Sequence, residues 1–140
     1  MRTTPSTEAM KSVTVAPPNS LIFIMDHAFG ETPESMGHGL VTSTDSCVAV
    51  ATLCEFDGAT TVIVGADPQG VGAEILVFDG HLTVPSKQLS VCSALDEKLL
   101  SMDIPTSHVH LKVFANDATE PNFIAILVNH QPATQASTDL

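Results

Sequence analysis

The sequence is poor in basic side chains. Its 140 residues include five Lys and Arg but sixteen Asp and Glu, so the formal net charge is -11 at pH 7. Because contacts to phosphates depend on Lys and Arg, this composition argues against direct binding of nucleic acid. It is compatible with a basic protein partner, since opposite charges steer such an encounter.

Long apolar segments are also absent. No run approaches the roughly 18 apolar residues of a transmembrane helix, and polar residues occupy the place where a secretory signal has its apolar core. We therefore expect a cytoplasmic protein without a membrane partner. The cysteines, Cys47, Cys54 and Cys92, form no CxxC pair and agree with a reducing compartment. We expect them to be buried, unreactive thiols.

What the sequence does contain is a series of short apolar runs. Residues 108–114 alternate strictly between apolar and polar, and residues 123–128 are apolar on both faces, which predicts a central strand covered on both sides. Asp57-Gly58 and Asp79-Gly80 lie between such runs and predict two hairpin turns. With about nine short strands and no helical periodicity, we expect an all-β fold, a single-domain antiparallel β-sandwich.

The domain boundaries follow from composition. Residues 12–130 form the β-sandwich domain, without an internal repeat or a linker. The polar segments 1–11 and 131–140 are expected to be disordered. The predicted core consists of apolar residues at alternate strand positions: Val48, Val50, Ile63, Ile75, Val77, Leu82, Val84, Val91, Leu100, Val109, Leu111, Val113, Ile124 and Ile126.

Six histidines raise the question of a metal site. His108 and His110 project from one face of a predicted strand, and His81 is the third residue such a site would use. No spacing in the sequence supplies a diagnostic set of ligands, so a solvated strand face is the simpler interpretation, and we predict no metal and no cofactor. The alternative is a small-molecule- or metal-binding sandwich, a sensor or enzyme, that uses His27, His38, His81, His108 and His110.

Catalytic motifs are missing. The sequence contains neither a G-x-S-x-G elbow nor a P-loop. Asp26 and His27, as neighbours on an extended chain, would point apart. We therefore predict that the protein is not an enzyme. Self-assembly is a third possibility, because Pro85 marks an edge strand that a second copy could extend.

The acidic residues fall in predicted turns. Turns favour Asp for backbone reasons alone, so ordinary solubility is one explanation. Hairpin turns also gather at the ends of a sandwich, where several carboxylates would form a docking surface for a basic protein. We assign this partner-binding role to Glu55, Asp57, Asp96, Glu97, Asp117 and Glu120.

Two segments resemble a known family. They are Thr83-Val84-Pro85, at the end of one predicted strand, and Leu100-Ser101-Met102-Asp103-Ile104-Pro105, at the end of a later one. With the strand order over residues 21–128, they resemble the competence protein J family, whose members inhibit a DNA-entry nuclease. The resemblance implies an all-β, immunity-like inhibitor that docks on a nuclease, and it assigns no role to single residues. The basic DNA cleft of a nuclease would suit an acidic partner.

Overall fold

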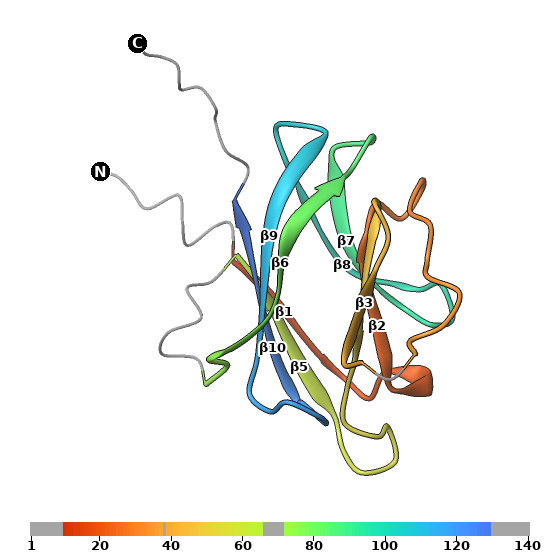
Figure 1. The fold of residues 1–140 in the computed structure, drawn as a ribbon, viewed down its shortest axis with the longest axis vertical. Coiled ribbons are helices and arrows are strands. Elements are labelled where there is room, and N and C mark those ends of the chain that lie inside the picture. Colours follow the sequence, from red (N-terminus) through yellow and green to blue (C-terminus); the bar gives the residue numbers. More distant parts are fainter. Residues whose placement is uncertain (1–9, 38, 66–71, 130–140) are drawn as a thin grey trace.

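The structure, a computed structural model, describes residues 10–37, 39–65 and 72–129 (Figure 1). No helix in this part of the chain is long and apolar enough to cross a membrane. The terminal segments expected to be disordered lie outside the described residues, except for Met10 and for Lys11, which already belongs to the first strand. The elements are β1 (Lys11–Val15), the 3-10 helix η1 (Pro18–Ser20), β2 (Leu21–Met25), β3 (Val41–Ser43), β4 (Cys47–Ala51), β5 (Thr60–Val64), β6 (Ile75–Thr83), β7 (Gln88–Ser93), β8 (Lys98–Asp103), β9 (His108–Ala115) and β10 (Phe123–Asn129).

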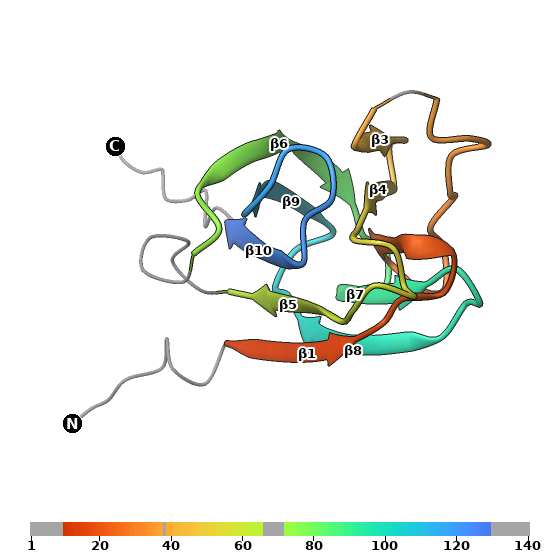
Figure 2. The same cartoon turned by 90° about the horizontal axis from the view of Figure 1, so that it is seen from below.

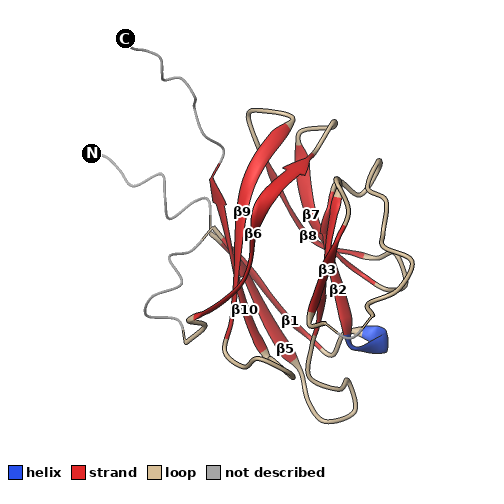
Figure 3. Ribbon diagram, in the orientation of Figure 1, coloured by secondary structure: helices blue, strands red, loops and turns tan. Residues whose placement is uncertain are grey.

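The strands form two five-stranded sheets that face each other (Figures 1 and 3). One sheet has the order β1-β5-β10-β9-β6, and the other has the order β3-β4-β2-β7-β8. Among the described pairs, β10 and β5 run parallel and the others run antiparallel. The predicted all-β sandwich is confirmed, with ten strands. The strand missing from the sequence analysis is β3, which has only three residues.

Alternation builds the core between the sheets. In β9, Val109, Leu111 and Val113 are buried, whereas His108 and His110 face outward. The strand β10 lies in the middle of its sheet, between β5 and β9, as its apolar sequence predicts. On the side of β1 and β8, the Lys11 ammonium donates a hydrogen bond to the Ser101 carbonyl (2.7 Å) and links the two sheets.

The predicted hairpin at Asp57-Gly58 is wrong. The strand β4 belongs to one sheet and β5 to the other, so residues 52–59 cross between the sheets. Gly58 has a φ of 155°, and the chain does reverse here. Turn chemistry reports that the chain turns back, but it does not specify which strand the returning segment pairs with. Both strands bury one face against the same core, so either pairing satisfies the local pattern.

The second predicted hairpin, at Asp79-Gly80, is also wrong. The strand β6 continues through both residues, with Asp79 opposite Lys112 and Gly80 opposite Leu111 of β9. The ring of Phe78 lies over Gly80, where an added Cβ would come within 2.8 Å of the Phe78 Cζ atom. Glycine in this strand therefore leaves room for a neighbouring ring and does not form a turn.

Four of the predicted core positions are not in the buried core. In β5 it is Val62 and Val64 that point inward, so Ile63 lies half-buried on the other face. Ile75 is 42% exposed at the start of the edge strand β6. Val77 and Leu100 are half-buried and pack against the core from its margin. In β5 the sequence analysis chose the wrong set of alternate residues as the inward-facing set. In β6 and β8 the pairing with the neighbouring strand is irregular, which shifts the side chains from the faces that strict alternation predicts. The other predicted core residues are buried.

A second, smaller cluster lies on the outer face of the β3-β4-β2-β7-β8 sheet. It consists of Met25, Cys47 and Cys92, with Phe23 packed against them. Burial raises the pKa of the Cys47 thiol to about 12, with a smaller contribution from Cys92. Burial likewise raises the pKa of Cys92 to about 11. These two cysteines are buried as predicted, whereas Cys54 is half-buried in the loop after β4.

Candidate functional site

The β1–β2, β4–β5 and β9–β10 connections leave the sandwich at the end that faces the viewer in Figure 2, whereas the β7–β8 turn lies at the side of that view. In the register of the sheet, Leu21 lies opposite Ala51 and Ile22 lies opposite Ser93, so β2 begins where β4 and β7 end. None of the three connections at this end contains Lys or Arg. We call the surface that they form the acidic end, and it comprises residues 16–20, 52–59 and 116–122.

Hydrogen bonds between backbone groups join these connections across the two sheets. The Leu53 N–H donates to the Pro121 carbonyl (2.8 Å), and the Thr52 N–H donates to the Ser20 carbonyl (2.9 Å). The β4–β5 connection is thus held by both the β1–β2 and the β9–β10 connections. The three segments of the acidic end therefore form one continuous, fixed surface.

The β4–β5 connection carries two of the predicted partner-binding acids. The Glu55 N–H donates to the Ser20 hydroxyl (3.1 Å), and the Asn19 N–H donates to Glu55 Oε1 (2.5 Å). The Asp57 N–H donates to the Cys54 carbonyl (2.8 Å) and closes a tight turn. Phe56, between the two acids, is 88% exposed.

Asp117 shapes the β9–β10 connection. Its Oδ2 atom accepts hydrogen bonds from the Glu120 N–H (2.8 Å), the Thr119 N–H (3.0 Å) and the Thr119 hydroxyl (3.0 Å). The hydrogen bond from the Glu120 N–H, followed by those from Thr119, holds the pKa of the Asp117 carboxyl below its usual range. Asp117 is therefore a charged group that also fixes the turn, and it presents Glu120 at the surface.

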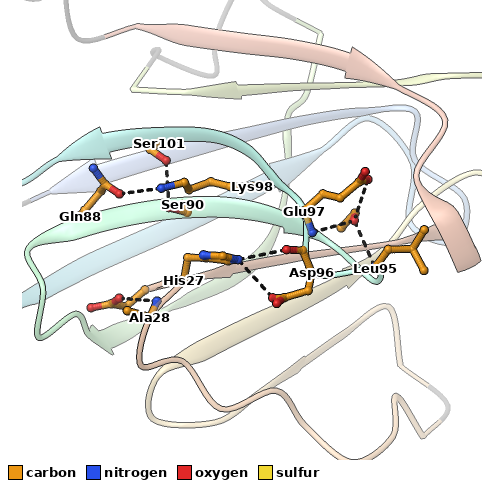
Figure 4. A network of polar contacts seen from close by, with 11 residues as sticks. His27, Ala28, Gln88, Ser90, Leu95, Asp96, Glu97, Lys98 and Ser101 are labelled. Atoms are coloured by element: carbon orange, nitrogen blue, oxygen red, sulfur yellow. Dashed lines mark hydrogen bonds and ion pairs between the residues drawn. The ribbon is translucent and has the colours of Figure 1, made fainter.

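The β7–β8 turn carries the remaining pair of predicted acids (Figure 4). Asp96 has a positive φ of 66° and turns toward His27, whose Nε2 atom lies 3.2 Å from Asp96 Oδ1 and 3.1 Å from the Asp96 carbonyl oxygen. Glu97 accepts a hydrogen bond from the Ser93 hydroxyl (3.3 Å). Leu95, at the tip of this turn, is 64% exposed. Part of the charge of Asp96 is thus directed at His27 and not outward.

The structure brings four of the six predicted acids to the acidic end, on the β4–β5 and β9–β10 connections, whereas Asp96 and Glu97 lie on the β7–β8 turn at the side of the sandwich. The sequence did not show which of these turns would lie together. It also did not show that Glu55, Asp96 and Asp117 have partners within the chain. Their role in partner binding stays a prediction.

The histidines proposed as alternative ligands are dispersed. His81 and His110 face each other across β6 and β9 with their ring centroids 5.0 Å apart, and His110 Nε2 contacts Asp79 Oδ1. That hydrogen bond is the main cause of a lowered pKa for the Asp79 carboxyl. His27 follows β2 of the other sheet and lies beside Asp96. Within the described residues, no three His, Cys, Asp or Glu side chains are placed to hold one metal ion. His38 lies outside the described residues.

Asp26 is a structural residue that the sequence analysis did not identify. Its side chain is 1% exposed, and it accepts hydrogen bonds from the Ser86 N–H (2.7 Å) and the Ala28 N–H (3.0 Å). Burial raises the pKa of the Asp26 carboxyl, but the hydrogen bonds from Ser86, Ala28 and Phe29 outweigh it, and the pKa is lowered overall. Asp26 is bonded to Ser86 and Ala28, whereas His27 contacts Asp96, so among the described contacts no hydrogen bond joins the two neighbours. In the sequence, the position of this acid directly after an apolar strand could have indicated a buried carboxylate.

Comparisons with known proteins support the fold. No family model and no curated protein matches this chain in sequence. Among solved structures, ComJ from Bacillus subtilis, an inhibitor of the DNA-degrading activity of NucA, is similar with a TM-score of 0.59 and 12% identity, over 84% of this chain and 93% of ComJ. The product of crocagin biosynthetic gene J is similar with a TM-score of 0.48 and 13% identity, over 85% and 95% of the two chains. The likeness to ComJ confirms the family resemblance as one of fold.

Proposed function

We propose that this protein is a non-enzymatic inhibitor that binds a basic nuclease through its acidic end. The observation that carries the proposal is the meeting of two acidic turns, the β4–β5 and β9–β10 connections, at one end of a rigid sandwich, in segments without any Lys or Arg. Such a surface attracts a cationic protein over several ångströms and orients it before contact. We place this encounter in the cytoplasm, as the composition predicts.

A nuclease is the basic partner that best fits this surface. A protein that degrades DNA presents cationic groups to the phosphates of its substrate. Carboxylates that pair with the same groups would exclude DNA from the cleft. The fold shared with ComJ supports this assignment, since ComJ inhibits the DNA-degrading activity of NucA. Inhibition of this kind requires no bond to be made or broken by the inhibitor.

In the proposed mechanism, the groups that speed association differ from those that give the complex its affinity. Exposed carboxylates at the rim of an interface speed association and make it sensitive to salt, but each adds little affinity. The hydrogen bonds that fix the β4–β5 and β9–β10 connections reduce the ordering that binding would require. We therefore expect fast, salt-dependent association with little rearrangement of the acidic end.

A DNA degradation assay tests the proposal. The probe is the fraction of a source-cell extract that binds a cation exchanger and degrades double-stranded DNA. We expect the purified chain to inhibit this fraction at low salt, and we expect added salt or excess DNA to relieve the inhibition. Unchanged degradation at low salt with an excess of the chain would contradict the proposal.

A further inference from the structure

Phe56 stands out among the apolar residues of the described part of the chain. Its side chain is 88% exposed, more than Leu95 at 64% and Phe29 at 58%. It lies between Glu55 and Asp57 at the acidic end. An isolated exposed apolar residue is common on protein surfaces, so exposure alone indicates nothing. The meaning of Phe56 depends on how the loop that carries it is held.

The chain on both sides of Phe56 is fixed by hydrogen bonds. Glu55 is held on both its backbone and its side chain, by the Ser20 hydroxyl and the Asn19 N–H. The Asp57 N–H is bound to the Cys54 carbonyl, 2.8 Å away. The ring therefore projects from a turn whose backbone is pinned on either side. A loop that simply tolerated an apolar residue would not need these constraints.

Rigid aromatic side chains of this kind are typical of interface anchors. Binding energy in protein interfaces concentrates in a few central, largely aromatic residues, surrounded by polar groups that exclude water. Phe56 has this arrangement, with a carboxylate on each side in sequence. Preorganisation of the turn lowers the entropy lost when the anchor is seated.

We propose that Phe56 is the apolar anchor of the docking surface and enters a recess of the partner that is lined by apolar groups and bordered by Lys and Arg. The inference rests on the proposed function, because it specifies the partner's surface. Glu55 and Asp57 then meet the bordering cations, while the ring fills the recess. The partner's binding site is therefore not uniformly charged.

Substitutions at Phe56 test this role in the DNA degradation assay, with the same cation-exchange nuclease fraction as probe. We expect Phe56→Ala to raise the concentration needed for half-inhibition at least tenfold, with the salt dependence unchanged. Phe56→Leu, which keeps an apolar side chain, should restore part of the loss. Phe29→Ala is the matched control, an exposed phenylalanine outside the acidic end, and it should inhibit like the wild type. Equal inhibition by Phe56→Ala and the wild type would overturn the proposal.

A spectroscopic experiment reports directly on the position of the anchor. The chain has no tryptophan, so Phe56→Trp introduces a single reporter. We expect its emission, taken as the difference from the wild-type mixture, to shift to shorter wavelength when the nuclease purified from that fraction is added. An indole that stays in water within an inhibited complex would refute the anchor while leaving the proposed function intact. Absence of inhibition by the wild-type chain would instead refute the proposed function itself.

Discussion

The carboxylate of Asp26 accepts a hydrogen bond from the backbone N–H of Ser86 over 2.7 Å, although sixty positions separate the two residues. This contact ties the connection after β2 to the connection between β6 and β7. It thereby joins loops from the two sheets at the end of the sandwich opposite to the acidic end. The carboxylate is buried but satisfied, so it contributes to stability as long as it is charged.

Replacing Asp26 should destabilise the fold. Asp26→Ala removes the acceptor of two partly buried hydrogen bonds, from the N–H groups of Ser86 and Ala28, and should lower the free energy of unfolding by about 2 kcal/mol. Asp26→Asn keeps one acceptor oxygen and should lose less. Glu34→Ala, an exposed acid, is the control and should change the free energy by less than about 0.5 kcal/mol. Urea denaturation measures all three, and an Asp26→Ala protein as stable as the control would contradict the role.

The same carboxyl should contribute to acid sensitivity. Its pKa is lower in the folded chain than in the unfolded chain, so the unfolded chain binds more protons at acidic pH. The stabilisation is therefore present above the ordinary pKa of Asp, about 3.9, and is lost as the pH falls through the lower folded value. We expect the stability of Asp26→Ala to fall less steeply with pH than that of the wild type. Urea titrations across acidic pH compare the two slopes, and equal slopes would exclude this contribution.

Two substitutions by threonine test which residues of β5 face the core. Val62 faces the core, whereas Ile63 lies half-buried on the outer face. Val62→Thr places a hydroxyl in the core and should lower the free energy of unfolding by about 1–3 kcal/mol. Ile63→Thr should lower it by less than about 1 kcal/mol, because the hydroxyl reaches water. If Ile63→Thr is the more damaging change, the register of β5 differs from the one described.

The cysteines should differ in reactivity. With pKa values of about 12 and about 11, Cys47 and Cys92 expose almost no thiolate at pH 8, and both are buried. We expect a thiol reagent to label one cysteine of the native chain rapidly, Cys54, and all three after denaturation. Cys54→Ser is the control, and it should abolish the rapid labelling. Rapid labelling of more than one thiol in the native chain would show that the cluster of Met25, Cys47 and Cys92 opens to solvent.

Neutralising the acidic turns should slow association with the nuclease. We expect Glu55→Gln with Asp57→Asn, and Asp117→Asn with Glu120→Gln, to lower the association rate at low salt and reduce its salt dependence. Both amides retain the acceptor oxygens that the turns use, so the fold should persist. We expect a smaller effect from Asp96→Asn with Glu97→Gln, because Asp96 already contacts His27.

The control pair for these variants is Asp45→Asn with Asp103→Asn, which removes the same charge from the opposite end. Stopped-flow mixing at two salt concentrations compares the rates. If the control pair slows association as much as the acidic-end pairs, the net charge of the chain matters and the location of the acids does not.

Strand positions could be predicted from the sequence where alternation is strict. The pattern of residues 108–114 identified β9 and both of its faces, because a period of two has one interpretation on a half-buried strand. The run at residues 123–128 identified β10 as central, since a strand apolar on both faces requires cover on both sides. The three residues of β3 were too short for such a pattern.

Pairing could not be predicted in the same way. Asp57-Gly58 and Asp79-Gly80 carry the same turn signal, yet one lies in a crossing between sheets and the other lies within β6. The ring of Phe78 over Gly80 explains the second case, and that contact depends on the long strand β9 alongside. Local residues therefore do not distinguish a hairpin from these alternatives.

The sequence by itself determined the all-β class, the acidic character and the location of the acids in turns, because composition and periodicity are local properties. Only the tertiary structure decided that two of the acidic turns share one end, that Asp26 is buried and bonded to Ser86, and that Phe56 projects from a fixed turn. Each of these depends on which strands lie side by side. That choice is made by the packing of the two sheets on one core, to which all strands contribute together and no single segment decides.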